Sequence, residues 1–75
     1  MTYEEAKELM RGVPPGMTLT IDGEDASITH RQTLGSFILR KGGRRQACGF
    51  YTAANFLKGF EEDQVKVTRT ERIAV

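Results

Sequence analysis

The stretch "MTLTIDGEDASITH", residues 17–30, decides the fold. Its apolar residues Met17, Leu19 and Ile21 alternate with threonines, which is typical of a strand with one buried face. The turn residues "DGED" follow, and the chain returns through "ASITHRQ", residues 26–32, as a second strand. The pattern therefore predicts an antiparallel hairpin, and parity places His30 on its apolar side.

A helix is expected before this hairpin. Thr2 and Glu5 have the spacing of a capping box, in which each side chain satisfies a backbone amide at a helix start. Apolar residues fall on one helical face, and Gly12 with the two following prolines supplies a stop. The sequence predicts an amphipathic helix over residues 3–11.

Two further strands are expected after the first hairpin. "SFILR", residues 36–40, has three consecutive large apolar residues and predicts an interior strand. "KGGR", residues 41–44, is expected to form a hairpin tip, because glycine tolerates the positive φ angles of a tight turn. The chain then returns through "RQACGFY", residues 45–51.

The remaining segments complete the order. Thr52 is expected to cap a second helix over residues 53–60, a polar connector follows, and "VKVTRTERIAV", residues 65–75, reads as a final strand. A chain of 75 residues can bury only one small core. We expect a single α+β domain, residues 1–75, with two layers: an antiparallel sheet of four or five strands and two helices on one face, in the order α-β-β-β-β-α-β.

Catalytic and metal-binding classes are disfavoured. One cysteine and one histidine leave too few soft ligands for structural zinc, and no cofactor motif is present. Cys48 with His30 is the only thiol and base pair, but a small thiol between Ala47 and Gly49 is typical of a buried structural cysteine. For His30, a strand-surface or partner-contact role is favoured over that of a general base. We expect a protein without enzymatic activity, metal or cofactor.

Targeting patterns and net charge predict the cellular location of the protein and the kind of electrostatic recognition it can use. The amino terminus "MTYEEAKELM" has no apolar stretch of a signal peptide, and no segment has the length of a membrane span, so we expect a cytoplasmic protein without membrane contact. The net charge of +1 is far from that of a dedicated nucleic-acid binder. Any electrostatic recognition must therefore be local.

A local basic cluster provides the candidate partner-binding site. Arg40, Lys41, Arg44 and Arg45 gather at the expected hairpin tip, Arg31 with His30 is expected to approach them from the neighbouring strand, and the acidic turns are expected at the opposite end. This cluster is interpreted as a contact either for a protein or ribonucleoprotein partner or for nucleic-acid phosphates, while solvated turn residues remain the plain alternative.

Two other features suggest partner contacts. Tyr51, beside Phe50, is expected to add an aromatic residue to the basic patch, because arginines and aromatics favour interface centres. The final strand is expected at a sheet edge, where it could pair with a second copy of the chain.

The segment "QACGFYTAANFLKGF", residues 46–60, followed by "QVKVTRTERIAV", residues 64–75, resembles small phage-encoded α+β proteins of the anti-CRISPR inhibitor type. That group shares no motif, so no functional residue is carried over. The resemblance implies stoichiometric blockade of a nucleic-acid-handling complex by surface binding. Double-stranded RNA binding domains have a similar α-β-β-β-α opening, but residues 51–60 lack the basic start of their final helix.

Overall fold

The predicted element order is confirmed by the computed structural model, which describes residues 1–69. The elements are α1 (Tyr3–Arg11), β1 (Met17–Ile21), β2 (Ala26–His30), β3 (Phe37–Lys41), β4 (Arg44–Cys48), α2 (Phe50–Leu57), a 3-10 turn (Glu62–Gln64) and β5 (Val65–Arg69). The chain is an α+β protein with a five-stranded antiparallel sheet and two helices that pack together.

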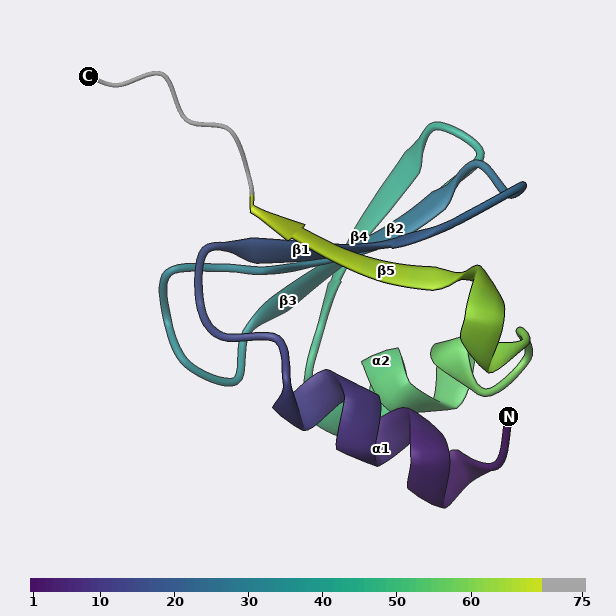
Figure 1. Ribbon diagram of the computed structural model, residues 1–75. Coiled ribbons are helices and arrows are strands. Elements are labelled where there is room, and N and C mark those ends of the chain that lie inside the picture. Colours follow the sequence, from purple (N-terminus) through teal and green to yellow (C-terminus); the bar gives the residue numbers. More distant parts are fainter. Residues whose placement is uncertain (70–75) are drawn as a thin grey trace.

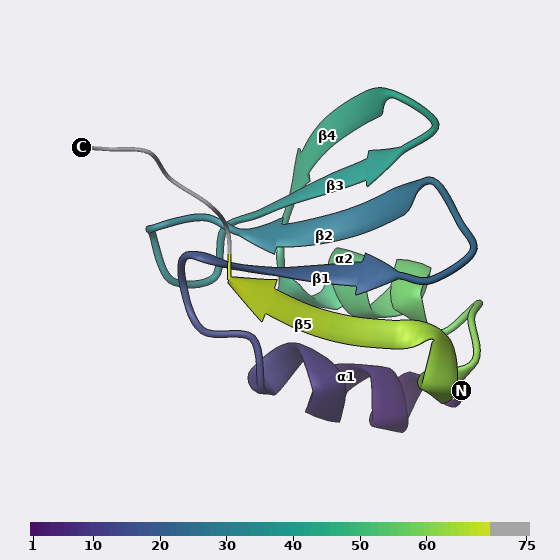
Figure 2. The ribbon, with the colours of Figure 1, turned by 45° about the horizontal axis from the view of Figure 1, so that its top comes forward.

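The strands lie in the order β4-β3-β2-β1-β5, so β4 and β5 form the two edges. Both helices cover the same face of the sheet (Figure 1). Within residues 1–69, no helix lies over the other face, which we call the open face (Figure 2). The hairpin formed by β3 and β4 extends beyond the helices, and residues 44–47 of β4 are exposed accordingly.

The core lies between the helices and the covered face. Its members come from both helices and from four described segments of sheet and loop: Ala6, Met10, Val13, Leu19, Ile21, Ala26, Ile28, Phe37, Ala53, Ala54 and Leu57. The alanines at 6, 53 and 54 are fully buried, and α1 packs directly against α2. Small side chains at this contact leave room for the large residues of the sheet beneath.

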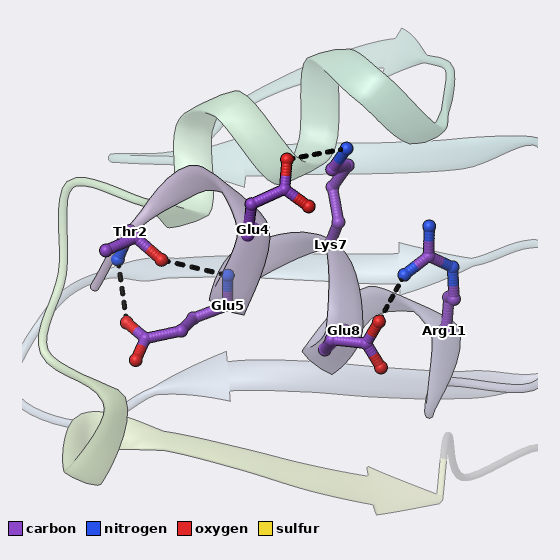
Figure 3. A network of polar contacts seen from close by, with 6 residues as sticks. All are labelled: Thr2, Glu4, Glu5, Lys7, Glu8 and Arg11. Atoms are coloured by element: carbon purple, nitrogen blue, oxygen red, sulfur yellow. Dashed lines mark hydrogen bonds and ion pairs between the residues drawn. The ribbon is translucent and has the colours of Figure 1, made fainter.

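The predicted capping box starts α1 (Figure 3). The Glu5 backbone N–H donates to Thr2 Oγ1 at 3.1 Å, and the Thr2 N–H donates to Glu5 Oε1 at 2.8 Å. The predicted hairpin tip is also present, since Gly42 and Gly43 have φ values of 58° and 84°. Two positive φ angles in a row are the turn geometry that fits the twist of a two-residue hairpin.

The second helix begins earlier than predicted. Gly49, not Thr52, is its N-cap, and β4 ends at Cys48 rather than at residue 51. The reason is the spacing of Phe50, Ala53 and Leu57, which a helix brings to one core-facing stripe and a strand would split between two faces.

Other bounds also differ. α2 ends at Leu57, whereas the predicted helix continued to residue 60. β2 ends at His30, and residues 31–36 form a loop. Of the expected final strand, Val65–Arg69 is present as β5, and residues 70–75 lie outside the described residues. Within residues 1–69, no helix is long and apolar enough to cross a membrane.

Candidate partner-binding site

Four cations occupy the end of the β3–β4 hairpin, which we call the basic hairpin (residues 40–45). The register places Arg40 opposite Arg45 and Lys41 opposite Arg44. Because directly opposed residues share a face, the two arginine side chains at 40 and 45 belong to the open face and the other pair to the covered face. The covered-face pair lies beyond the helices, so both faces of the basic hairpin are exposed and cationic.

Like charges directly opposite each other destabilise a strand pair. The basic hairpin contains two such pairs in succession, and among the described residues only one carboxylate compensates them. Asp25 Oδ1 lies 3.3 Å from Arg40 Nη2, with both side chains largely exposed. Lys41, Arg44 and Arg45 have no ion pair with any of residues 1–69.

The acidic turn of residues 22–25 lies next to the basic hairpin. The prediction that it lies at the opposite end of the molecule is wrong. The Gly42 N–H donates to the Asp25 carbonyl oxygen at 2.8 Å, and Ala26 pairs with Lys41 in the register. Antiparallel pairing of β2 with β3 brings the turn before β2 to the end of β3. Acidic and basic side chains therefore lie at the same end of the molecule, where Asp25 partly neutralises Arg40.

A hollow adjoins the basic hairpin. Its volume is about 550 Å³, and its lining comprises Leu39, Lys41, Gly42, Arg44, Arg45 and Gln46. Half-buried Leu39 gives the hollow an apolar patch, and the surrounding cations give it positive charge. These are the properties that accept a carboxylate or phosphate group together with the carbon atoms that carry it.

The prediction that Arg31 approaches the basic hairpin is wrong. His30 pairs with Phe37 at the start of β3, whereas the tip lies at its end. The Arg31 N–H donates to the Ser36 carbonyl oxygen at 2.8 Å and closes the loop at that far end of the sheet. Because adjacent antiparallel strands run in opposite directions, the carboxyl end of β2 lies far from the carboxyl end of β3.

Tyr51 is exposed, at 67%, but it is not part of the basic patch. It lies in the first turn of α2, edge-on to Phe50 with ring centroids 5.2 Å apart. The length of β4 separates it from Arg44 at the tip. It instead lines a shallow hollow with Tyr3, Thr52, Asn55 and Lys58.

His30 is buried, at 4% exposure, so parity placed it correctly and the strand-surface interpretation is wrong. Its Nδ1 lies 2.6 Å from the Val13 carbonyl oxygen, and the Gly35 N–H donates to Nε2 at 3.0 Å. A carbonyl only accepts and an N–H only donates, so the ring is the neutral tautomer with its proton on Nδ1. Both nitrogens are engaged, which leaves His30 a structural role.

Cys48 is half-buried and, as the one cysteine of the chain, forms no intrachain disulfide. Burial raises the pKa of its thiol above the ordinary value, which disfavours the thiolate. Phe37 lies between Cys48 and His30 in the sheet register, so the two residues do not form a thiol and base pair. Within residues 1–69, no three histidine, cysteine, aspartate or glutamate side chains gather as metal ligands.

The open face is a second polar surface, which the sequence interpretation did not identify. The register assigns to it Thr68, Thr18, Thr29, Ile38 and Ala47 in one row, and Lys66, Thr20, Ser27, Arg40 and Arg45 in the next. Neither row contains a carboxylate. Thr18 Oγ1 and Thr29 Oγ1 lie 3.1 Å apart, as neighbours on one face do. Alternation along each strand indicates which of its residues face away from the core. The strand order is also needed to know which of these residues lie side by side.

Comparisons with family models, with curated proteins and with solved structures found no match to this chain.

Proposed function

We propose that the protein is a non-enzymatic binding protein that occupies an acidic site on a nucleic-acid-handling protein or ribonucleoprotein complex, as an inhibitor of the anti-CRISPR type. The observation that carries the proposal is the register of the basic hairpin, which sets like charges opposite each other twice: Arg40 opposite Arg45 and Lys41 opposite Arg44. This arrangement costs folding stability, and the cost is offset when an anionic partner supplies the missing charges.

The shape of the basic hairpin supports the same proposal. It projects beyond the helices (Figure 1) and carries cations on both faces, so it fits a cleft with acidic walls on either side. By the register, Lys41 and Arg44 belong to the covered face and meet one wall, while Arg40 and Arg45 belong to the open face and meet the other. Resemblance to anti-CRISPR inhibitors supplies the class of partner.

The test is a quantitative pull-down from an extract of cells that express the protein, with the recovered partner identified by mass spectrometry. The double variant Arg44→Glu/Arg45→Glu is compared with Arg31→Glu/Lys58→Glu, which changes the net charge equally at exposed positions away from the basic hairpin. We expect the first variant to lose the partner and the second to retain it. Retention by a folded Arg44→Glu/Arg45→Glu protein would refute the proposal.

A second candidate is direct binding of nucleic acid, favoured by the open face. Its cations Lys66, Arg40 and Arg45 share a row with two hydroxyl residues, and lysine, arginine and hydroxyl side chains are the usual contacts of phosphate oxygens. Threonine is also what strand propensity selects for a solvated sheet face, which is why this candidate ranks second.

Lys66 separates the two candidates because it lies on the opposite edge strand from the basic hairpin. Fluorescence anisotropy with a labelled DNA duplex at two salt concentrations measures direct binding, which must weaken steeply as salt rises. If nucleic acid lies across the open face, Lys66→Glu weakens duplex binding. If a protein cleft encloses the basic hairpin alone, the duplex does not bind and Lys66→Glu leaves partner recovery unchanged.

A further inference from the structure

An apolar cavity lies at the end of the sheet away from the basic hairpin. It opens between the end of α1, the loop of residues 31–36 and the start of α2, and its volume is about 330 Å³. Met10, Val13 and Phe37, each 1% exposed, form its bottom. A cavity of about 150 Å³ lined by apolar side chains holds benzene, so this one has room for an aromatic ring with a short chain.

The mouth of the cavity is apolar as well. Leu34 lines it and is 80% exposed, which makes Leu34 the most exposed large apolar side chain among the described residues. Phe50, at the start of α2, also lines the cavity and is only partly buried. An occupant would therefore cover apolar surface at the mouth as well as at the bottom, and removal of that surface from water favours binding.

The ionisable residues that line the cavity are both basic. Within residues 1–69, these lining residues are Arg11 and His30, and no carboxylate lines the cavity. Both nitrogens of His30 are already engaged, by the Val13 carbonyl and the Gly35 N–H. Among the lining residues that the structure describes, Arg11 therefore carries the charge that a ligand can meet, and a positive charge favours an anion.

The Arg11 guanidinium is available at the mouth. Its central carbon lies 5.7 Å from the centroid of the Phe50 ring. One nitrogen, Nη1, donates to Glu8 Oε2 at 2.6 Å (Figure 3), and the other N–H groups have no acceptor among residues 1–69. The pair with Glu8 is exposed and contributes little to stability, so a ligand carboxylate can share or replace it.

We propose that this cavity binds a small apolar carboxylate, with its hydrocarbon part against Val13 and Phe37 and its carboxylate on Arg11. A short aromatic acid matches both the volume and the aromatic lining. The cavity adjoins the first residue of β3 and the basic hairpin begins near its last, so this site is separate from the proposed partner-binding surface.

The experiment is a titration of the ¹⁵N-labelled full chain with 3-phenylpropionate, followed by amide NMR shifts. A ligand of about eleven non-hydrogen atoms is expected to bind with a dissociation constant in the millimolar range. The amides of Gly35 and Phe50 should shift most. The neutral isostere 3-phenylpropionamide should bind about three- to fivefold more weakly, because it loses the charge contact with a partly exposed arginine.

Two substitutions at one position test the role of charge. Arg11→Met keeps the apolar stem and should remove the preference for the acid, whereas Arg11→Lys should keep it. Equal affinity of the wild-type chain for acid and amide would overturn the proposal, as would shifts confined to amides away from the cavity or the absence of any shift. Shifts of the cavity amides that depend on protein concentration alone, and that Leu34→Ser abolishes, would assign the cavity to a second copy of the chain and overturn it too.

Discussion

Arg45 lies directly opposite Arg40 on the open face, and like charges in directly opposed positions destabilise a strand pair. We predict that Arg45→Glu raises the free energy of unfolding by about 0.5 kcal/mol, because it replaces a repulsive cross-strand pair by an attractive one. Urea denaturation at low salt measures the change, and Arg31→Glu serves as the control. If Arg45→Glu is less stable than wild type, the opposed arginines do not destabilise the hairpin.

His30 links β2 to the connection after α1 through its bond to the Val13 carbonyl. His30→Phe keeps a ring against Phe37, whose centroid lies 4.2 Å from that of the imidazole, but leaves the buried Val13 carbonyl and the Gly35 N–H without partners. We predict a loss of about 1–3 kcal/mol of unfolding free energy in urea denaturation. A change within about 0.5 kcal/mol, as expected for exposed Arg31→Ala, would show that water replaces both bonds.

Glu5 should make the stability of α1 depend on pH. The Thr2 backbone N–H donates to the Glu5 carboxylate and lowers the pKa of Glu5 below its ordinary value. A carboxyl with a lower pKa in the folded state stabilises fully above its unfolded pKa, and loses this contribution as pH falls through the folded pKa.

Glu5→Gln is the matched control because glutamine still accepts the Thr2 N–H but does not titrate. We predict that urea midpoints of wild type and Glu5→Gln differ most at neutral pH, and that the difference shrinks as pH falls below about 4.5. A difference that stays constant down to pH 2 would show that the Glu5 charge does not contribute.

Cys48 should react slowly with a disulfide reagent such as dithiobis(nitrobenzoate). Burial raises the pKa of the thiol, so less thiolate is present at pH 8 in the folded chain than in the unfolded one. We predict slower modification in buffer than in concentrated urea at the same pH. Equal rates would indicate an accessible thiol and would reopen the case for thiol chemistry.

Local signals in the sequence predicted local structure well. The capping box of Thr2 and Glu5 and the tip glycines at 42 and 43 act through residues close in sequence, and both features are present. Thr52 was mistaken for a cap because the residue type is right, but the apolar stripe from Phe50 to Leu57 extends the helix to Gly49. Packing against the core outweighs one capping hydroxyl.

The surroundings of the candidate site depended on pairing between distant segments. Arg31 was expected near the basic hairpin, and the acidic turn away from it, yet the register of β2 against β3 gives the reverse. His30 shows the same limit: alternation predicted its face, but its burial is set by Val13, which is 17 residues away in sequence. The open face likewise requires the strand order, since its cations come from β3, β4 and β5.

We propose that the basic hairpin is the partner-binding surface. The most direct measurement is the dissociation constant of the recovered partner for wild type, Arg44→Glu/Arg45→Glu and Arg31→Glu/Lys58→Glu at one ionic strength. We predict that the hairpin variant binds at least about tenfold more weakly while remaining folded, and that the control stays within about twofold of wild type. Equal affinities for the two variants would contradict it.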